Sequence, residues 1–502
     1  MDIEVITGSI QEQKAQAVVV NLFEGIEEPG GATGALDKAV GGQIRDLIAG
    51  GDFKGQRNEI AVLYPGEAIP ARRVIVVGLG KPEKFSAEIA RQAAASAAQK
   101  ARDLGVTHLH TVVHGAGSAG LSPGLGAQAV AEGTILGLYR FRELKTQEEE
   151  GEKKPELEAL TLVEFDPERK AVLEAGARAG QILADSACLA RDLSNRPANV
   201  ATPSHMAEVA RKIAEEADLD CQVLDKAEME ALGMQLLLSV NQGGGEPARF
   251  IVLEHNAGCD DLPAIALVGK GITFDTGGIS IKPSQGMERM KGDMSGGAVV
   301  LAALRAVGLL GLPLRVVGLV PVTENMPDAF ATKPGDVFGS LKGLTVEIIN
   351  TDAEGRLILA DALTYAGEFK PSAIFDIATL TGSRIVALGD YAAAVMGDEA
   401  LIEQLRTAGE ASWERVWPLP LFEEYGEQIK SDVADVKNVG GRSGGAITAG
   451  FFLSKFVPED IPWVHIDIAG LEFIEKTRSY IPKGATGFGT RLLVELLRHW
   501  EA

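Results

Sequence analysis

Short runs of β-branched and other apolar residues alternate along most of the chain with longer helical patterns. An alanine-rich pattern at residues 86–105, for example, follows a strand-like run at 73–80. Strands that alternate with helices favour a mostly parallel sheet whose two faces are covered by helices, so the sequence predicts an α/β fold. The strand-like runs lie at residues 17–22, 73–80, 107–113, 248–255, 263–271, 314–322, 344–350, 372–380 and 463–470.

Length and one long helical pattern divide the chain. At 502 residues it is about three times a typical domain, so two domains with separate cores are expected. We predict that each domain is a mostly parallel or mixed sheet with helices on both faces: an N-terminal domain over 1–167 and a C-terminal domain over 195–502. Residues 168–194, with apolar side chains three and four apart, are predicted to form a connecting helix. A charged run at 146–158 is predicted to be a solvated loop of the first domain.

Composition limits the classes of partner. Hydrophobic residues make up 46% and charged residues 24% of the chain, as in ordinary globular proteins. The net charge of −22 works against attraction to nucleic acid or anionic lipid. Cys188, Cys221 and Cys259 are widely spaced and form no CxxC pair, so a disulfide framework and a thiolate zinc site are not indicated.

No targeting pattern is visible. The N-terminal residues lack a basic segment followed by an apolar one, as a signal peptide requires. The most apolar long stretch, 299–322, is interrupted by Arg305, Pro313 and Arg315, which is unsuitable for a membrane span. We therefore predict a cytoplasmic protein.

Acidic residues follow several predicted strands of the second domain, within the glycine-rich segments "KGITFDTGG", "KGDMSGGA" and "NTDAEGRL". Ligands of open α/β sheets bind beyond the carboxyl ends of the strands, so Asp275, Asp293, Asp352 and Glu354 are expected to converge there. Four carboxylates would repel one another unless cations lay among them. A pair of divalent metal ions about 3.5–4 Å apart, bridged by Asp275 and Glu354, would satisfy this arrangement.

Two lysines, Lys270 and Lys282, accompany these carboxylates. Lys270 could stabilise them as an ammonium, or act as a metal ligand in its neutral form, and the residues alone do not choose between these roles. None of the seven histidines lies within these segments. Oxygen ligands suit manganese or magnesium, although zinc also binds carboxylates, so the identity of the metal stays open.

Simpler interpretations share these residues. Thr351 and Glu354 fit a capping box for a helix that begins near Arg356, and Asp352 would be favoured by the helix dipole. The segment "FDTGG" also resembles a phosphate-binding turn, so a metal-dependent phosphotransferase or phosphatase is an alternative. Against it, the chain contains no GxxxxGK[ST] motif and no GxGxxG that opens a helix after a strand. No G-x-S-x-G is present to support a serine nucleophile.

Taken together, the motifs resemble those of the leucyl aminopeptidase family, the cytosol aminopeptidases with two metals. The first domain is similar only in general layout. The resemblance rests on "KGITFDTGGISIKP" (270–283), "KGDMSGGA" (291–298), "NTDAEGRL" (350–357), "NRPANVATP" (195–203), "DVADVKN" (432–438), "GGAITAGFFLSKF" (444–456), "HIDIAG" (465–470) and "GATGFGTRLL" (484–493).

The resemblance implies two sets of metal ligands. Lys270, Asp275, Asp293 and Glu354 would hold the tighter metal, with Lys270 as a neutral ligand. Asp275, Asp352 and Glu354 would hold the more exchangeable metal, with the backbone carbonyl of Asp352 as a further ligand. The ions expected from the family are Mn²⁺ or Zn²⁺.

The resemblance also implies the remaining catalytic parts. Arg356 would hold a bicarbonate ion as general base, and Lys282 would polarise the tetrahedral intermediate. The enzyme would remove N-terminal leucine and other apolar residues from short peptides, and family members form homohexamers whose active sites face an interior cavity. Some also bind DNA, which the net charge opposes here. The pocket for the N-terminal side chain would be formed by Met290, Thr379, Gly382 and Ala469.

Overall fold

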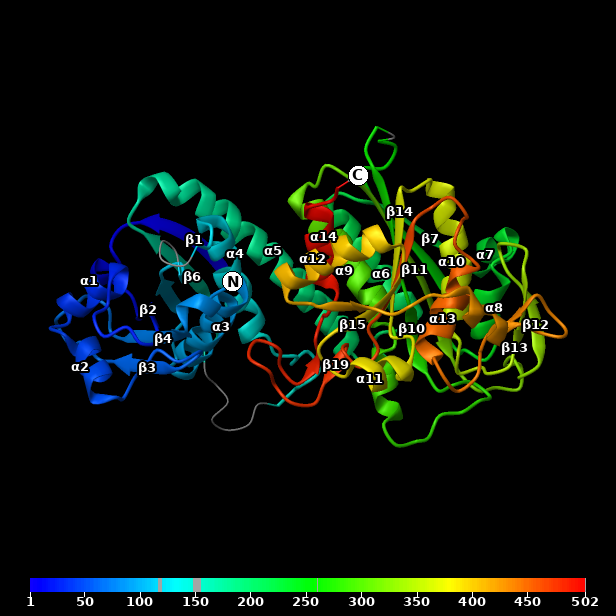
Figure 1. Ribbon diagram of the computed structural model, residues 1–502, viewed down its shortest axis with the longest axis horizontal. Helices are drawn as coiled ribbons and strands as arrows, with labels where there is room; N and C mark the ends of the chain where they lie inside the picture. The colour runs from blue at the N-terminus through cyan, green and yellow to red at the C-terminus, as the bar shows by residue number, and fades with distance from the viewer. Residues whose placement is uncertain (116–119, 148–154, 260, 502) are drawn as a thin grey trace. The chain divides into compact units, whose positions relative to one another are not determined.

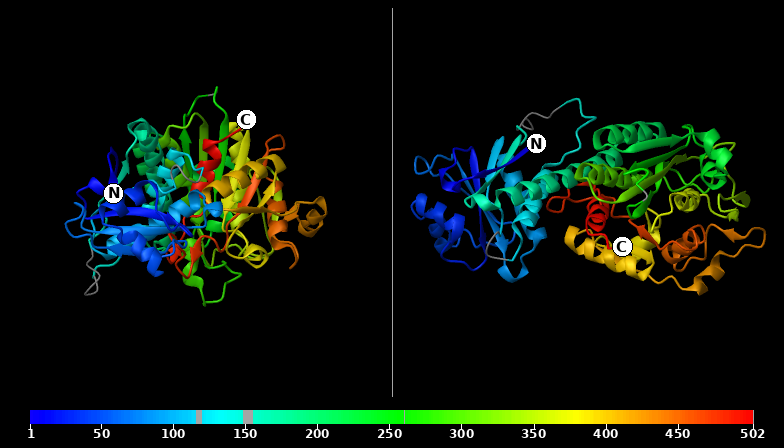
Figure 2. Two further views of the ribbon diagram at one scale, coloured as in Figure 1. Left: turned by 60° about the vertical axis from the view of Figure 1, so that its left-hand side comes forward. Right: turned by 90° about the horizontal axis from the view of Figure 1, so that it is seen from above.

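A computed structural model describes residues 1–115, 120–147, 155–259 and 261–501 (Figure 1). It divides into two compact units, Met1–Asp185 with Lys476–Pro482, and Ser186–Glu475 with Lys483–Ala502. The predicted long helix is present as α5 (Lys170–Asn195), which is labelled in Figure 1 and can be followed again in the right-hand view of Figure 2. Residues 148–154 of the charged run that we predicted as a loop lie outside the described residues.

The first unit is built on a six-stranded sheet in the order β1-β6-β5-β2-β4-β3. All neighbouring strands are parallel except β3, which runs antiparallel to β4. Alternate residues of β2 face two separate cores: Val19 packs with α3 and α4, and Val18 packs with α1 and α2. The strands are β1 (Asp2–Thr7), β2 (Ala17–Phe23), β3 (Ile60–Leu63), β4 (Val74–Gly80), β5 (His108–Thr111) and β6 (Ala159–Glu164), and the helices are α1 (Gly31–Ala39), α2 (Gln43–Gly50), α3 (Ala87–Asp103) and α4 (Pro123–Leu138).

The second unit contains a nine-stranded mixed sheet in the order β16-β15-β18-β14-β9-β11-β8-β7, with β10 paired to β11. The central strands β11, β9, β14 and β18 are parallel, whereas β7, β8 and β15 run antiparallel to a neighbour. The strands are β7 (Asp220–Leu224), β8 (Arg249–His255), β9 (Ala264–Gly269), β10 (Gly271–Asp275), β11 (Arg315–Asn325), β14 (Ala373–Ala378), β15 (Ala393–Gly397), β16 (Val416–Pro418) and β18 (Trp463–Asp467).

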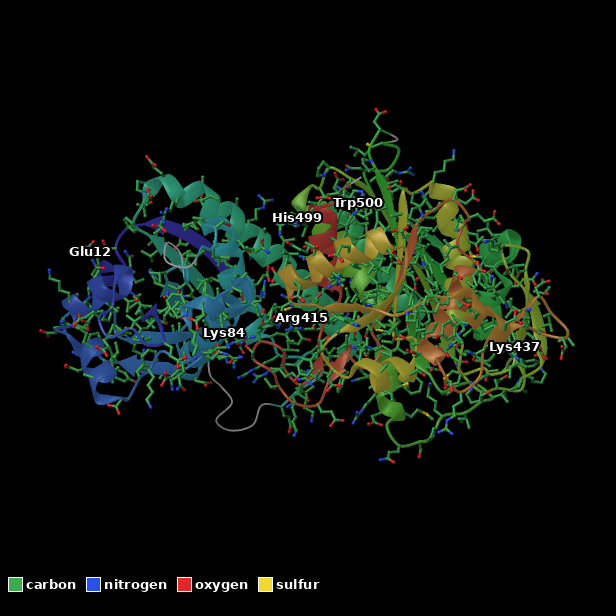
Figure 3. The ribbon with its side chains drawn as sticks, in the orientation of Figure 1. Glu12, Lys84, Arg415, Lys437, His499 and Trp500 are labelled. Carbon is green, nitrogen blue, oxygen red and sulfur yellow. The ribbon has the colours of Figure 1, made fainter. Side chains whose placement is uncertain are left out.

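Helices cover both faces of this large sheet. In Figure 1, α9 and α10 lie on opposite sides of β11 and β14. Helix α9 packs with α6 and α14, and α10 packs with α8 and α13 around a large apolar core. Trp500, labelled in Figure 3, lies just after α14 and meets the ring of Phe375 edge-on at a centroid distance of 5.9 Å. The helices are α6 (Pro203–Ala217), α7 (Lys226–Leu232), α8 (Gln235–Asn241), α9 (Ser295–Leu310), α10 (Gly355–Ala366), α11 (Gly382–Leu388), α12 (Glu399–Ser412), α13 (Gly445–Ser454) and α14 (Thr490–Arg498).

The predicted strand at 344–350 is not part of the large sheet. It is shortened to β13 (Thr345–Ile348), which pairs with β12 (Asp336–Gly339) and β17 (Val436–Lys437) in a separate three-stranded sheet. We expected Asp352 and Glu354 to follow a strand of the same sheet as Asp275. This expectation is wrong, because the strand before them belongs to the smaller sheet. A last pair, β19 (Phe473–Ile474) and β20 (Gly484–Ala485), completes the described strands.

One helical stretch, Met287–Leu310, has the length and apolar composition of a membrane span. Of its most apolar 18-residue window, 78% is buried inside the structure, as in the core helix of a globular unit. Its α9 portion packs onto β9, β11 and β14, and Gly296 permits the close approach, since a Cβ there would lie 2.2 Å from the carbonyl oxygen of Ile377. This approach carries the segment before α9, with Asp293, to the carboxyl ends of the strands.

Candidate metal centre

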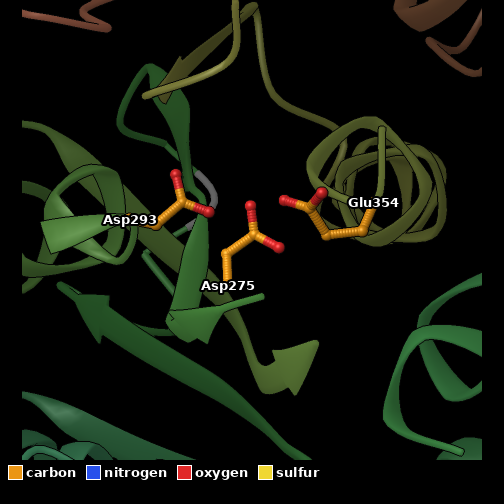
Figure 4. Close-up of side chains that lie close together, drawn as sticks. All are labelled: Asp275, Asp293 and Glu354. Atoms are coloured by element: carbon orange, nitrogen blue, oxygen red, sulfur yellow. The ribbon is translucent and has the colours of Figure 1, made fainter. Parts of the chain in front are cut away.

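Three buried carboxylates from separate segments meet at the carboxyl edge of the large sheet. Asp275 ends β10, Asp293 precedes α9, and Glu354 directly precedes α10. One oxygen from each lies within 4.8 Å of the others, and Figure 4 shows the carboxyl groups close together. Their residues are 2%, 8% and 2% exposed, so the three charges share a space that bulk water does not screen.

Lys270, which directly follows β9, is buried among these carboxylates. Its Nζ lies 2.7 and 2.8 Å from the two oxygens of Asp293 and 2.9 Å from Oε1 of Glu354, and it donates to the carbonyl oxygen of Thr379 at 3.1 Å. Burial lowers the pKa of Lys270, but the charges of Asp293, Glu354 and Asp275 outweigh it, so the net shift is upward. Without a metal, Lys270 is therefore an ammonium that neutralises part of the acidic cluster.

Lys282 provides a second cation at the more open side of the cluster. Its Nζ lies 2.8 Å from Oδ2 of Asp275 and 2.5 Å from Oδ1 of Asp352. Burial lowers its pKa and these carboxylates, together with Glu354, raise it above the ordinary value. Its side chain is 22% exposed, against 4% for Lys270, so Lys282 is the lysine of this cluster that a molecule arriving from solvent can reach.

The carboxylates repel one another despite the two lysines. Burial raises the pKa of Asp293, and Glu354 and Asp275 raise it further against the opposing effect of Lys270. Burial and the charge of Asp275 likewise raise the pKa values of Glu354 and Asp352. The cluster therefore favours added positive charge or protons.

The two lysines do not satisfy every carboxylate oxygen at this site. Oε2 of Glu354 is buried and has no hydrogen-bond or ion-pair partner among the described residues. Oε1 of Glu354, Oδ2 of Asp293 and Oδ1 of Asp352 have only lysine ammonium groups as partners. Buried polar atoms are normally paired, and carboxylate oxygens that face one space in this way match the hard oxygen ligands of divalent cations. The residues present thus fit a metal centre.

Two asparagines hold the acidic segments in place. Asn325, at the end of β11, donates from Nδ2 to Oδ1 of Asp275 at 2.8 Å and to the carbonyl oxygen of Thr351 at 3.0 Å. Asn438 accepts from the backbone N–H groups of Ile349 and Asn350 at 2.9 and 3.3 Å, and is fully buried. Sequence reasoning assigned neither residue a role, and the position of Asn438 within "DVADVKN" was the one signal available.

The predicted capping box is wrong. Helix α10 begins at Gly355, and its N-cap, Glu354, makes no side-chain capping bond. Thr351 instead donates from Oγ1 to the carbonyl oxygen of Gly277 at 2.7 Å and accepts from the N–H of Ser280 at 2.8 Å. These bonds fasten the segment that carries Asp352 and Glu354 to the turn after β10. Gly355 also lacks room for a side chain, because a Cβ there would lie 2.5 Å from Cε of Lys270.

Arg356 lies in the first turn of α10 and is buried. Its Nη1 donates to the carbonyl oxygen of Asn438 at 2.7 Å, while its Nε is buried without a hydrogen-bond partner. Burial lowers the pKa of Arg356 to about 10, against the raising effects of Glu354 and Asp467. A buried guanidinium with unused donors suits a small oxyanion.

The four residues predicted for a side-chain pocket have different surroundings. Thr379 is buried, and its Oγ1 donates to Oδ1 of Asp293 at 2.7 Å, so it supports the carboxylate cluster directly. Ala469 is buried and donates its N–H to Asp467 at 3.1 Å, and Gly382 begins α11 with open space where a Cβ would stand. Met290 is half-buried in the 3₁₀ helix that precedes Asp293.

The chain is similar to known peptidases over almost its full length. Residues 188–494 match the catalytic domain of the cytosol aminopeptidase family, and residues 19–148 match its N-terminal domain. A probable cytosol aminopeptidase of Geotalea uraniireducens (strain Rf4) is 47% identical over 92% of both chains. Another, of Chlorobaculum tepidum, is 49% identical over 90% of this chain and 91% of its own.

Solved structures agree with these matches. A mutant of tomato leucine aminopeptidase superposes with a TM-score of 0.87 at 32% identity, over 99% of this chain and 96% of its own. The bottromycin maturation enzyme BotP in complex with Mn superposes with a TM-score of 0.84 at 35% identity, over 96% and 99% of the two chains. With matched catalytic and N-terminal domains and relatives aligned along nearly their whole length, the chain belongs to the cytosol aminopeptidase family of metal-dependent peptidases.

Proposed function

We propose that this protein removes the N-terminal residue from short peptides, with a preference for leucine and other apolar residues. The observation that carries the proposal is the buried cluster of Asp275, Asp293 and Glu354, whose converging carboxylate oxygens fit divalent cations. Two ions held there would supply an activated water and polarise the scissile carbonyl at neutral pH. The similarity to BotP, whose structure was solved in complex with Mn, supports manganese, and zinc is the second candidate.

The proposed ligands form two overlapping sets. Lys270, Asp275, Asp293 and Glu354 would hold the tighter ion, and Asp275, Asp352 and Glu354 the more exchangeable one, with the carbonyl oxygen of Asp352 as a further ligand. The short distances between Lys270 and the carboxylates support a shared site. As a ligand, Lys270 must lose its proton, and metal cations among the same carboxylates would favour that loss by repelling the ammonium.

Two basic residues would act on the substrate and on the attacking water. Lys282, accessible at the rim of the cluster, would stabilise the negative charge that develops on the carbonyl oxygen during attack. Arg356 would hold a bicarbonate ion that accepts a proton from the water, and its unpartnered Nε supports this role. Met290, Thr379, Gly382 and Ala469 would shape the pocket for the N-terminal side chain.

The first test of the function is metal analysis combined with an activity assay. Purified protein should contain divalent metal, cleave leucine p-nitroanilide, lose this activity on exhaustive chelation and regain it with Mn²⁺ or Zn²⁺. The same preparations should leave p-nitrophenyl phosphate uncleaved, which separates the peptidase from the phosphatase alternative. Full peptidase activity in protein shown to be metal-free would contradict the proposal.

Replacement of Arg356 by alanine should lower kcat by about 100-fold, the low end of the contribution of a positioned base, because water and buffer anions partly replace the bound ion. Metal content should not change, since Arg356 is not a proposed ligand. Added bicarbonate should raise kcat of the unmodified enzyme in bicarbonate-free buffer but not that of Arg356→Ala. The matched control, Arg356→Lys, keeps the positive charge but lacks the planar guanidinium group. Equal responses of enzyme and variant to bicarbonate would refute the role.

We further propose that the protein works in the cytoplasm as a homohexamer and does not bind DNA. The names of its relatives support the location, and the net charge of −22 opposes DNA binding. Light scattering should give six times the chain mass of 52.9 kDa. A gel-shift titration at low salt should detect no complex with DNA, and a specific complex there would overturn that part of the proposal.

A further inference from the structure

The first unit contains a cavity of about 940 Å³ at the carboxyl edge of its sheet. Its walls come from the ends of the parallel strands β1, β2, β5 and β6, and from the start of α1. The volume is at the upper end of the range for pockets that enclose small-molecule ligands. None of the residues proposed for the metal centre lines this cavity.

The topology of the sheet places the cavity where ligands commonly bind. After β2 the chain passes through α1 and α2 to β3 and then β4 on one side, and after β5 it passes through α4 to β6 on the other. The connections thus diverge between the neighbouring strands β2 and β5, and both strand ends line the cavity. In open α/β sheets this switch point, beyond the carboxyl ends of the strands, is the usual ligand position.

Helix α1 presents unpaired backbone donors at this position. Its N-cap is Gly30, which provides no side-chain cap, and a Cβ on Gly30 or Gly31 would meet nothing within 4 Å. Among the described residues, no acceptor pairs with the N–H groups of Gly31, Ala32 and Thr33. Thr33 Oγ1 donates to the carbonyl oxygen of Asn21 at 2.6 Å, which fixes the helix start beside β2. Such a helix end binds phosphate oxygens through its N–H groups and its dipole.

Two residues at the end of β6 point to a ligand larger than a simple anion. Glu164 lines the cavity and is 7% exposed; its Oε1 accepts from the N–H of Asp166 at 3.0 Å, and its Oε2 has no partner among the described residues. An unpaired carboxylate oxygen can accept from sugar hydroxyl or amino groups. Phe165 also lines the cavity and is 76% exposed, so its ring offers a flat apolar surface.

We propose that this cavity binds a nucleotide. The phosphate would lie on the N-terminus of α1, the sugar hydroxyls would donate to Glu164, and the base would stack against Phe165. The guanidinium of Arg169 also lines the cavity, where its Nε lies 3.4 Å from Oδ2 of Asp166, and Glu28 is a second carboxylate of the lining beside Glu164. A phosphate or an amino acid alone would leave most of the volume unfilled. The N-terminal unit thereby gains a binding role that does not depend on the peptidase reaction.

Isothermal titration of the full chain with ADP, AMP, adenosine and inorganic phosphate tests this inference. ADP and AMP should bind at least about ten-fold more tightly than adenosine, because the helix N-terminus contributes only to ligands with phosphate. Phe165→Ala should weaken AMP binding and leave phosphate binding unchanged. Absence of ADP and AMP binding, or equal binding of adenosine and AMP, would overturn the inference.

The variant Gly30→Asp locates the binding. Gly30 has an extended backbone with φ of −107° and ψ of −179°, which an aspartate adopts without strain. Its carboxylate would cap α1 and occupy the phosphate position with negative charge, so the affinity for ADP should fall at least ten-fold while the melting temperature stays equal or rises. Ala68→Asp, at an exposed position of the same unit outside the cavity lining, is the matched control and should bind ADP normally. ADP binding that persists in Gly30→Asp, for example at the metal centre, would refute the assignment. Peptidase activity should be unchanged in both variants.

Discussion

Replacement of Glu354 by alanine is expected to lower kcat for peptide hydrolysis by at least about 1,000-fold and to remove bound metal. Glu354 is the carboxylate that both proposed metal sites share with Asp275; its Oε1 lies 2.9 Å from Nζ of Lys270, and its Oε2 is buried without a partner among the described residues. Metal polarisation contributes several kcal/mol to such reactions, and each ~1.4 kcal/mol is worth a factor of ten. Metal content by elemental analysis and kcat with leucine p-nitroanilide would measure the two effects.

The fold should survive this change. Lys270 keeps both oxygens of Asp293 within 2.8 Å, so its buried ammonium does not lose all of its partners. Removal of one carboxylate also relieves the repulsion that helps to raise the pKa of Asp293. The metal-free variant should therefore melt at or above the temperature of the metal-free parent protein.

The matched control for this variant is Glu354→Gln, which keeps the volume and removes the charge. Added Mn²⁺ should raise the melting temperature of the parent protein by mass action but not that of either variant. Undiminished metal content and activity in Glu354→Ala would remove this residue from the site, whereas an unfolded Glu354→Gln would show that its role is structural.

Replacement of Lys282 by alanine is expected to lower kcat by about 100- to 1,000-fold, with a smaller change in KM. A preorganised donor to developing negative charge contributes about this much, and the effect belongs to the transition state rather than to substrate binding. Lys282 is the more exposed of the two lysines of the cluster. Steady-state kinetics with leucine p-nitroanilide would give the separate changes in kcat and KM.

Metal content distinguishes this role from a structural one. Lys282 contacts Asp275 and Asp352, so its loss frees two proposed ligands and should leave metal binding equal or tighter. Lys282→Arg, which retains the positive charge, should recover part of kcat. If Lys282→Ala lost its metal along with its activity, the residue would instead act by holding the carboxylates in place.

The residue types and motifs of the second unit were sufficient to predict the family to which the chain belongs. Asp275 and Lys270 each lie within a residue of a strand end, so their meeting at the carboxyl edge followed from local sequence alone. The position of Asp293 needed the glycines of α9, whose close packing on β14 is a tertiary contact. The 344–350 segment has the pattern of a sheet strand, but its partners are β12, a four-residue strand just before it, and β17, a two-residue strand far along the chain. Neither is long enough to be recognised from its sequence pattern.

Thr351 shows most directly what the local sequence does not predict. Its spacing to Glu354 satisfies the capping pattern, but its hydroxyl bonds to Gly277 and Ser280, more than 70 residues earlier. A hydroxyl forms a hydrogen bond with whichever partner the fold brings near, and the neighbouring residues do not determine that partner. The roles of Asn325 and Asn438 could not be predicted for the same reason, because their hydrogen-bond partners are 50 and 88 residues away.

By itself, the sequence determined the α/β class, the long connecting helix and the set of carboxylates and lysines available for metal chemistry, because these depend on local periodicity and residue type. The tertiary structure alone decided which of those side chains share one buried space, how asparagine and threonine side chains fasten the acidic segments, and where the first unit opens a cavity. Burial, long-range hydrogen bonds and charge repulsion act between segments far apart in the chain, so they exist only once the chain has folded.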